Sequence, residues 1–185
     1  MNVSLQALVG KLDDACRGAL EAAAGLCLTR TNYDVDLEHL FLKLTEMSDG
    51  DIAYILRHYQ IDSSRLARDL TRALDRLKTG NARTPALSPR IPKLVQDAWL
   101  MASVDYGTPK VRSGHLLAAL LADDDLAPIA RDISHEFASI SLESLRRDFS
   151  KITAGSAEDK TVSVPARGSE EKPTAGSRAL DQYTV

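Results

Sequence analysis

The sequence predicts an all-α fold made of two consecutive four-helix units, and three observations lead to this prediction. The chain is rich in Leu and Ala but has three Phe, one Trp and five Tyr among 185 residues, which favours helices over strands. Apolar residues recur at helical spacing throughout residues 4–153. The pattern of the first half of this stretch then returns in the second half.

In the first half, a short polar residue that favours an N-cap position stands before each expected helix. These leading residues are Ser4, Asp13 or Asp14, Asp36, Asp49, and Asp62 or Ser63. The apolar stripes that follow them lie within residues 5–9, 12–27, 37–44, 52–56 and 66–77. Gly80 is expected to end the last of these helices, and residues 80–87 are expected to form a polar loop.

The second half has the same layout. Ser88 is expected to cap the next helix, with Pro89 at its first position. Ser113 and Ser141 are expected to cap two later helices. The apolar stripes lie within residues 94–102, 116–121, 126–133 and 142–152, and Trp99 in the first of them is expected in the core.

The two halves align as a repeat. His39-Leu40 and His115-Leu116 stand 76 positions apart, and residues 66–70 match residues 145–149 at an offset of 79. The shorter offset also relates Ala22 to Ala98, Val35 to Val111, and Leu44 to Leu120. Repeats spanning about residues 4–80 and 85–153 are therefore expected to pack with pseudo-twofold symmetry into one domain, residues 1–153.

The composition changes after this domain. Residues 154–178 are mostly Gly, Ser, Ala, Glu, Lys, Thr and Pro, without a periodic apolar pattern. Such a segment cannot offset its own ordering entropy, so we expect a flexible linker. Residues 179–185 regain apolar residues and are expected to begin a following module, which makes the chain a fragment of a longer protein.

Composition and charge exclude several classes of protein. A net charge of -3 is too neutral for nucleic-acid binding by bulk electrostatics. The longest apolar run, residues 116–122, is too short to cross a membrane, and residues 1–12 lack a signal-peptide pattern. Cys16 and Cys27 lie too far apart on one helix to form a disulfide, so we expect buried thiols in a reducing cytosol.

Some polar residues invite a functional interpretation, but a structural role fits each better. His39 and His115 have no nucleophile nearby in sequence and are expected to bond the loop before their helices. Residues 123–125, three aspartates, lack the Gly and Glu of a calcium loop and are expected to cap a helix. The cations of the fifth helix are expected to form a solvated face paired with Asp69 and Asp75; they are Arg65, Arg68, Arg72, Arg76 and Lys78. We expect no catalytic residue and no metal ligand.

Longer motifs resemble a known family. The tandem helical repeat with Glu38-His39-Leu40 and Gly114-His115-Leu116-Leu117 resembles the N-terminal domain of Clp-family AAA+ unfoldases, over about residues 10–153. Residues 19–27, 69–83 and 85–89 are similar to the ClpV (TssH) branch of type VI secretion, and residues 179–185 look like the entry to its first ATPase module. The chain has no G-x-x-x-x-G-K-[ST] loop, so no cofactor is expected here, and ATP and magnesium are expected in the parent protein.

The resemblance implies a substrate-recognition module. ClpV-type ATPases are hexamers of the Gram-negative cytoplasm that disassemble the contracted secretion sheath, and their N-domain binds a short helix near the N-terminus of the larger sheath subunit. This fragment is then expected to be monomeric, with neither nucleic acid nor membrane as a partner. Two alternatives stay open: a general Clp N-domain that docks an adaptor or unfolded substrate for proteolysis, and a stand-alone enzyme.

A candidate surface for such a helix lies where the repeats meet. Residues 3–12 are apolar on more than one side, whereas a terminal helix needs only one buried stripe. A groove between this segment and the start of the second repeat could hold an amphipathic helix through anchors at i, i+3, i+4 and i+7. The candidate peptide-binding residues are Leu5, Leu8, Val9, Leu12, Leu87 and Ile91. The alternative is that residues 5–12 simply complete the core.

Overall fold

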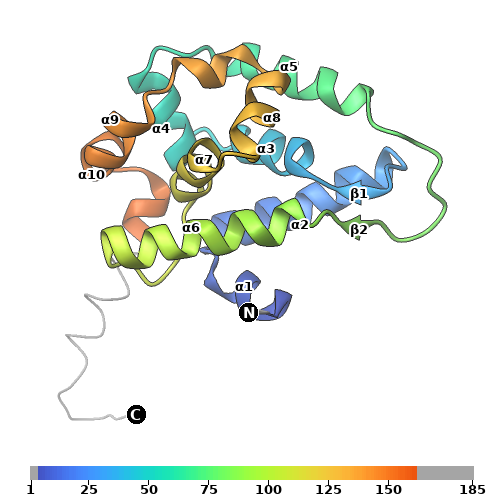
Figure 1. Ribbon diagram of the computed structural model, residues 1–185, viewed down its shortest axis with the longest axis horizontal. Coiled ribbons are helices and arrows are strands. Elements are labelled where there is room, and N and C mark those ends of the chain that lie inside the picture. Colours follow the sequence, from blue (N-terminus) through green and yellow to red (C-terminus); the bar gives the residue numbers. More distant parts are fainter. Residues whose placement is uncertain (1–3, 162–185) are drawn as a thin grey trace, which may run out of the picture.

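A computed structural model describes residues 4–161 and confirms an all-α fold (Figure 1). The first half contains α1 (Leu5–Lys11), α2 (Asp14–Thr29), α3 (Leu37–Thr45), α4 (Asp51–His58) and α5 (Ser63–Asp75). The second half contains α6 (Arg90–Tyr106), α7 (Ser113–Ala122), α8 (Leu126–Ile133), the 3-10 helix η1 (His135–Ser139), α9 (Leu142–Arg147) and α10 (Phe149–Ile152). Two short strands, β1 (Asp34–Val35) and β2 (Ala86–Leu87), join the halves.

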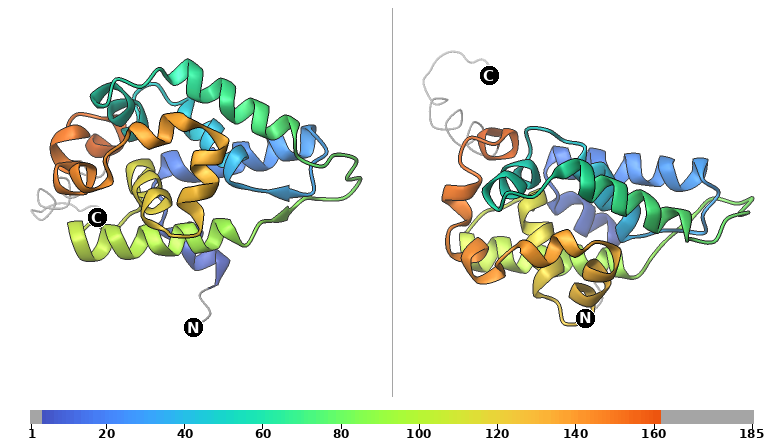
Figure 2. Two further views of the ribbon diagram at one scale, coloured as in Figure 1. Left: turned by 45° about the horizontal axis from the view of Figure 1, so that its top comes forward. Right: turned by 90° about the horizontal axis from the view of Figure 1, so that it is seen from above.

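The helices follow the predicted repeat. Helices α2 and α3 begin 76 residues before α6 and α7, respectively, and α4 precedes α8 by 75. In Figures 1 and 2, α2 and α6 both run along the long axis of the domain. Helix α5 corresponds to α9 and α10 together, which replace the single helix expected over residues 142–152 because the chain turns at Asp148. Helix α1 precedes this scheme and has no counterpart in the second half.

Two parallel backbone pairings interlock the repeats. Val35 pairs with Leu87 in the β1–β2 ladder, and Leu12 pairs with Val111 in an isolated bridge. The β1–β2 ladder joins the residues before α3 in the first repeat to the residues before α6 in the second. The bridge joins the residues before α2 in the first repeat to the residues before α7 in the second. Neither pairing was predicted, because a two-residue strand has no measurable period in sequence.

The core lies between the repeats, around α7. Residues 113–120 of this helix are all buried. Helix α7 is apolar on every side, as expected for a helix surrounded by others, and Figure 2 shows it enclosed by the rest of the domain. Trp99 is half-buried and packs against this core from α6.

Some predicted helix ends are shifted. Ser113 is the first residue of α7 rather than its cap, and Arg112 takes the cap position. Gly50 instead of Asp49 caps α4, and Pro89 itself stands at the N-cap of α6. Helix α5 ends at Asp75, although Gly80 does adopt the left-handed φ of 98° that favours glycine.

The domain extends beyond its predicted C-terminal boundary. Residues 154–161, assigned to a linker on composition, pack against the body of the domain, and residues 157–161 are helical. Ser156 and Glu158 are buried, and the Ala157 N–H donates to the Asp49 carbonyl at 2.8 Å. Composition failed here because two buried polar side chains, not an apolar stripe, attach the segment. The rest of the predicted linker and the predicted entry to a following module lie outside the described residues.

Candidate functional site

The predicted peptide-binding residues fall into two groups. Leu8, Leu12 and Ile91 are 3%, 1% and 1% exposed, so they belong to the core. Leu5 is 47% exposed, and Val9 and Leu87 are half-buried. The split arises because Leu8 lies on the buried side of α1, which packs on α6, and Leu12, at the C-cap of α1, pairs with Val111.

Local contacts hold α1 in place. The Ser4 hydroxyl accepts a hydrogen bond from the Ala7 N–H at 3.1 Å and so caps the helix as predicted. At the other end, Lys110 Nζ donates to the Gly10 carbonyl at 2.8 Å. The ammonium group of Lys11 lies 5.3 Å from the centroid of the Trp99 ring in α6. Helix α1 is therefore capped at its start, attached to the rest of the domain at its C-terminal end, and leaves Leu5 exposed to solvent.

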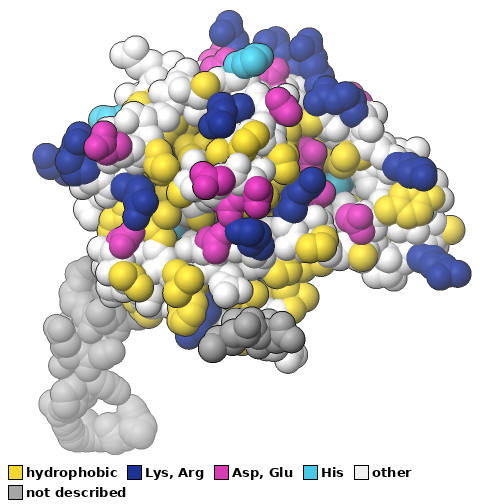
Figure 3. Space-filling view, in the orientation of Figure 1, with side chains coloured by type: hydrophobic (Ala, Val, Ile, Leu, Met, Phe, Trp, Pro, Cys, Tyr) yellow, Lys and Arg dark blue, Asp and Glu magenta, His cyan; other side chains and the backbone are white. Residues whose placement is uncertain are grey.

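Helix α6 adds exposed apolar residues that sequence reasoning missed. Leu100 is 47% exposed and Val104 is 76% exposed. They stand four positions apart, outside the buried stripe of residues 94–102, and this spacing was the available signal. We call the residues Leu5, Val9, Trp99, Leu100 and Val104 the α1–α6 surface. Figure 3 shows hydrophobic side chains gathered along the lower edge of the molecule, over α1 and α6.

The two repeat histidines have the predicted structural role. His39 Nδ1 accepts a hydrogen bond from the Asp36 N–H at 3.0 Å, and His115 Nδ1 accepts one from the Arg112 N–H at 3.0 Å. Each imidazole thus satisfies the backbone donor of its own N-cap residue. His39 Nε2 also bonds Asn32 Oδ1 at 2.9 Å. His115 Nε2 has no hydrogen-bond partner, and its ring stacks on Phe149 with 4.7 Å between centroids.

Burial keeps both imidazoles neutral. It lowers the pKa of His39, and burial together with the nearby Arg112 guanidinium lowers the pKa of His115 to about 3. An unfolded histidine has a pKa near ~6.5. Between these values the unfolded chain binds a proton that the folded chain does not, so stability rises with pH across this window.

We therefore expect the contribution of His115 to the free energy of unfolding to fall as the pH is lowered from about 6.5 to about 3. Urea unfolding of the wild type and of His115→Gln across this range measures the effect, because the wild type should show the steeper loss. His135→Gln, at an exposed histidine, is the matched control and should keep the wild-type slope. Equal slopes for the wild type and His115→Gln would contradict the assignment.

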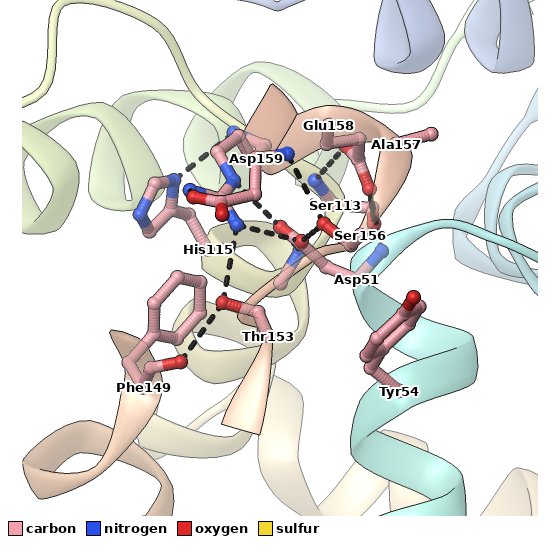
Figure 4. Close-up of polar contacts among 12 residues, drawn as sticks. Asp51, Tyr54, Ser113, His115, Phe149, Thr153, Ser156, Ala157, Glu158 and Asp159 are labelled. Atoms are coloured by element: carbon pink, nitrogen blue, oxygen red, sulfur yellow. Dashed lines mark hydrogen bonds and ion pairs between the residues drawn. The ribbon is translucent and has the colours of Figure 1, made fainter. Parts of the chain in front are cut away.

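A buried polar network joins the two repeats to the C-terminal segment. We call Asp51, Arg112, Ser113, Ser156 and Glu158 the seam network; Figure 4 shows its labelled members pointing toward one another from α4, α7 and residues 156–158. Arg112 Nε and Nη2 donate to the two oxygens of Asp51 at 2.9 and 2.7 Å. Ser156 Oγ donates to Asp51 Oδ1 at 2.6 Å. Asp51 is 0% exposed and Arg112 is 5% exposed, so this ion pair is shielded from solvent.

Glu158 connects the two repeats within this network. Its carboxyl accepts hydrogen bonds from the Asp51 N–H at 2.8 Å and the Ser113 N–H at 2.7 Å, at the N-terminal ends of α4 and α7. Burial, then the charges of Asp51 and Asp13, raise the pKa of Glu158 to about 8. The interior thus favours the protonated acid while the helix N-termini favour the anion. The residue fastens both repeats to the segment that sequence reasoning took for a linker.

One cluster next to this network has the residue types of a metal site. Asp13, Cys16 and Glu158 place one candidate ligand atom each within 4.8 Å of one another, all buried. These atoms are engaged internally, because Asp13 Oδ1 accepts from the Cys16 N–H at 2.8 Å and the Cys16 thiol donates to Glu158 Oε1 at 3.7 Å. Burial raises the pKa of the Cys16 thiol well above its usual value, which disfavours the thiolate that a metal requires. We therefore assign this cluster a structural role.

Asp125 stands at the N-cap of α8, and Asp123 supplies the side-chain acceptor at this helix start, because its Oδ1 accepts from the Asp125 and Leu126 N–H groups at 2.8 and 2.9 Å. Within residues 4–161, no helix is both long and apolar enough to cross a membrane.

Comparisons with known proteins agree with this fold. The model of the Clp repeat (R) N-terminal domain family matches residues 11–164. The AAA+ ATPase ClpV1 of Pseudomonas aeruginosa is 34% identical over 178 residues, which are 96% of this chain and 20% of that protein. The chain therefore spans about a fifth of the length of this relative.

Solved structures show the same likeness. A chain from work on the coevolution of the ATPase ClpV, the TssB–TssC sheath and the accessory HsiE protein has a TM-score of 0.82 and 36% identity, covering 85% of this chain and 97% of that one. A complex of a ClpV N-domain with a VipB peptide has a TM-score of 0.74 and 28% identity, covering 85% and 96%. With the family model matching most of its length, this chain belongs to the Clp N-terminal domain family and is similar to the N-domains of ClpV ATPases of type VI secretion systems.

Proposed function

We propose that this chain is the substrate-recognition domain of a ClpV-type unfoldase. It binds the N-terminal helix of the larger type VI sheath subunit and recruits contracted sheath for ATP-driven disassembly. The observation that carries the proposal is the likeness to a ClpV N-domain solved with a VipB peptide. The exposed apolar residues of α1, the helix outside the repeat, support the proposal with a surface of suitable chemistry.

The proposed site is the α1–α6 surface, with Leu87 at the entry to α6. An amphipathic helix would bury its apolar side against Leu5, Val9 and Leu100. Leu8, Leu12 and Ile91, which we also expected at the site, are buried and act indirectly by holding α1 and α6 in position. Three or four anchors correspond to roughly micromolar affinity, and six copies in a ring add avidity.

The remaining parts of the proposal concern the parent protein. There, six copies assemble, ATPase modules bind ATP and magnesium, and the protein works in the cytoplasm of a Gram-negative bacterium. The domain described here contributes recognition and no chemical step of its own.

Leu5→Glu tests the proposed site. We expect this substitution to weaken binding of a labelled sheath N-terminal peptide by at least about tenfold, because it places a charge where an apolar anchor would be buried. Fluorescence anisotropy measures the affinity, and circular dichroism checks the fold. Leu28→Glu is the matched control: Leu28 is 57% exposed and lies about 21 Å along α2 from the end next to α1.

Leu28→Glu should bind like the wild type. Wild-type affinity in Leu5→Glu would reject the α1–α6 surface as the site. If the wild type binds an unfolded model substrate or a Clp adaptor but no sheath peptide, the domain has the general Clp role instead.

A further inference from the structure

A row of arginines runs along the solvent side of α5. The arginine stripe consists of Arg65, Arg68 and Arg72 of α5 and Arg76 at its C-cap, which stand at spacings i, i+3, i+7 and i+11. Positions with these spacings fall within one narrow face of a helix. The core side of α5 is formed by other residues, namely Leu66, Leu70, Ala73 and Leu74. The stripe therefore faces away from the core along about 16 Å of helix.

The acidic residues of α5 do not neutralise this stripe, contrary to the sequence-based expectation of paired charges. Asp69 Oδ2 accepts a hydrogen bond from Ser134 Oγ at 2.6 Å. Asp75 Oδ1 pairs with Arg30 of α2 at 3.0 Å. Both carboxylates thus serve to attach α5 to neighbouring parts of the domain.

Few acidic groups elsewhere approach the arginines. Arg65 Nη1 lies 3.9 Å from Glu136 Oε2, a long contact, whereas the side chains of Arg68 and Arg72 have neither an ion pair nor a hydrogen bond within residues 4–161. Arg76 acts on the half-buried carboxyl of Glu38 only at longer range. All four side chains are exposed, and Figure 3 shows Lys and Arg gathered along the upper edge of the molecule, over α5. A domain with a net charge of -3 therefore carries a locally positive face.

The geometry favours an acidic protein segment as the partner. Guanidinium groups bind carboxylates in a planar two-point geometry, and a straight row about 16 Å long matches three turns of a helix with acidic residues on one side. Single-stranded nucleic acid is less suited, because its bases require stacking aromatics and α5 contains none.

We propose that the arginine stripe of α5 is a second interaction surface, which docks an acidic helical segment of another polypeptide. It lies on the opposite side of the domain from α1 (Figure 1), so both surfaces can be occupied at once. The arginine stripe does not depend on sheath recognition at the α1–α6 surface. A negative result at one surface would leave the proposal for the other unchanged.

A synthetic probe tests the stripe. It is a helical peptide of about 16 residues with four glutamates at i, i+3, i+7 and i+11, and its partner peptide has the same composition with the glutamates spread around the helix. The stripe variant is Arg65→Gln/Arg68→Gln/Arg72→Gln. The matched control removes the same charge from other exposed positions, as Arg147→Gln/Lys151→Gln/Lys160→Gln. Affinities are measured at about 50 mM salt and again at about 500 mM, where such contacts are screened.

We expect the wild type to bind the one-sided probe more tightly than the spread one, and the stripe variant to lose about tenfold in affinity. The control variant should stay within about twofold of the wild type. Absence of probe binding, equal losses in both variants, or equal binding of both peptides would overturn the proposal. Tighter binding of single-stranded DNA than of the peptide, with the same dependence on the stripe, would overturn it in favour of a nucleic-acid partner.

Discussion

Replacing Arg112 by methionine is expected to lower the free energy of unfolding by about 3–5 kcal/mol. Arg112 and Asp51 form a two-point ion pair in the seam network, and both are buried. Methionine has similar length but leaves the Asp51 carboxylate in the interior without its counter-charge. The desolvation of that charge, rather than the loss of attraction alone, produces the large effect.

Urea unfolding followed by circular dichroism measures this change. Arg146→Met is the control, because Arg146 pairs with Asp105 at 2.8 Å on the surface, and its loss should cost about 1 kcal/mol or less. The double variant Asp51→Leu/Arg112→Met removes both charges and should recover part of the stability lost in Arg112→Met. A loss in Arg112→Met no larger than in Arg146→Met would show that solvent reaches the pair.

Gly114→Ala is expected to cost about 3 kcal/mol of stability. Gly114 lies in α7, and a Cβ atom there would stand 2.7 Å from two ring carbons of Phe149 and 3.1 Å from Asp51 Cβ. Because the Phe149 ring is itself packed against His115, it has little room to move. The methyl group therefore forces α7 and α10 apart.

Gly18→Ala is the matched control in a helix interior. An added Cβ at Gly18 has no heavy atom within 4 Å, so alanine should stabilise α2 by about 0.5–1 kcal/mol. The same urea experiment compares both variants. Phe149→Leu removes the ring that the added methyl group would meet. The double variant Gly114→Ala/Phe149→Leu should therefore destabilise the domain by less than the sum of the two single substitutions. An unchanged midpoint for Gly114→Ala would mean that the helices separate at little cost.

The surface that we propose for recognition could be predicted only as a region. The excess of apolar residues in α1 correctly indicates that some of them stay exposed, but periodicity does not say which. Leu8 and Leu12 are covered and Leu5 is left open because of how α1 meets α6. Leu100 and Val104 were overlooked because exposed apolar residues are common on soluble proteins, and only the tertiary structure shows that α6 packs on α1.

The sequence by itself determined most of the helices, several of their caps, such as Ser4, Asp36 and Ser141, and the duplication. These are local features, set by apolar spacing, by N-cap residues and by motifs such as the two repeat histidines. Only the tertiary structure decided how the repeats interlock, that residues 154–161 belong to the domain, and that Asp51, Arg112 and Glu158 share one buried network. The physical reason is that burial and charge pairing depend on residues far apart in the chain: Glu158 meets Asp51 across 107 positions, and nothing in either neighbourhood reveals the other.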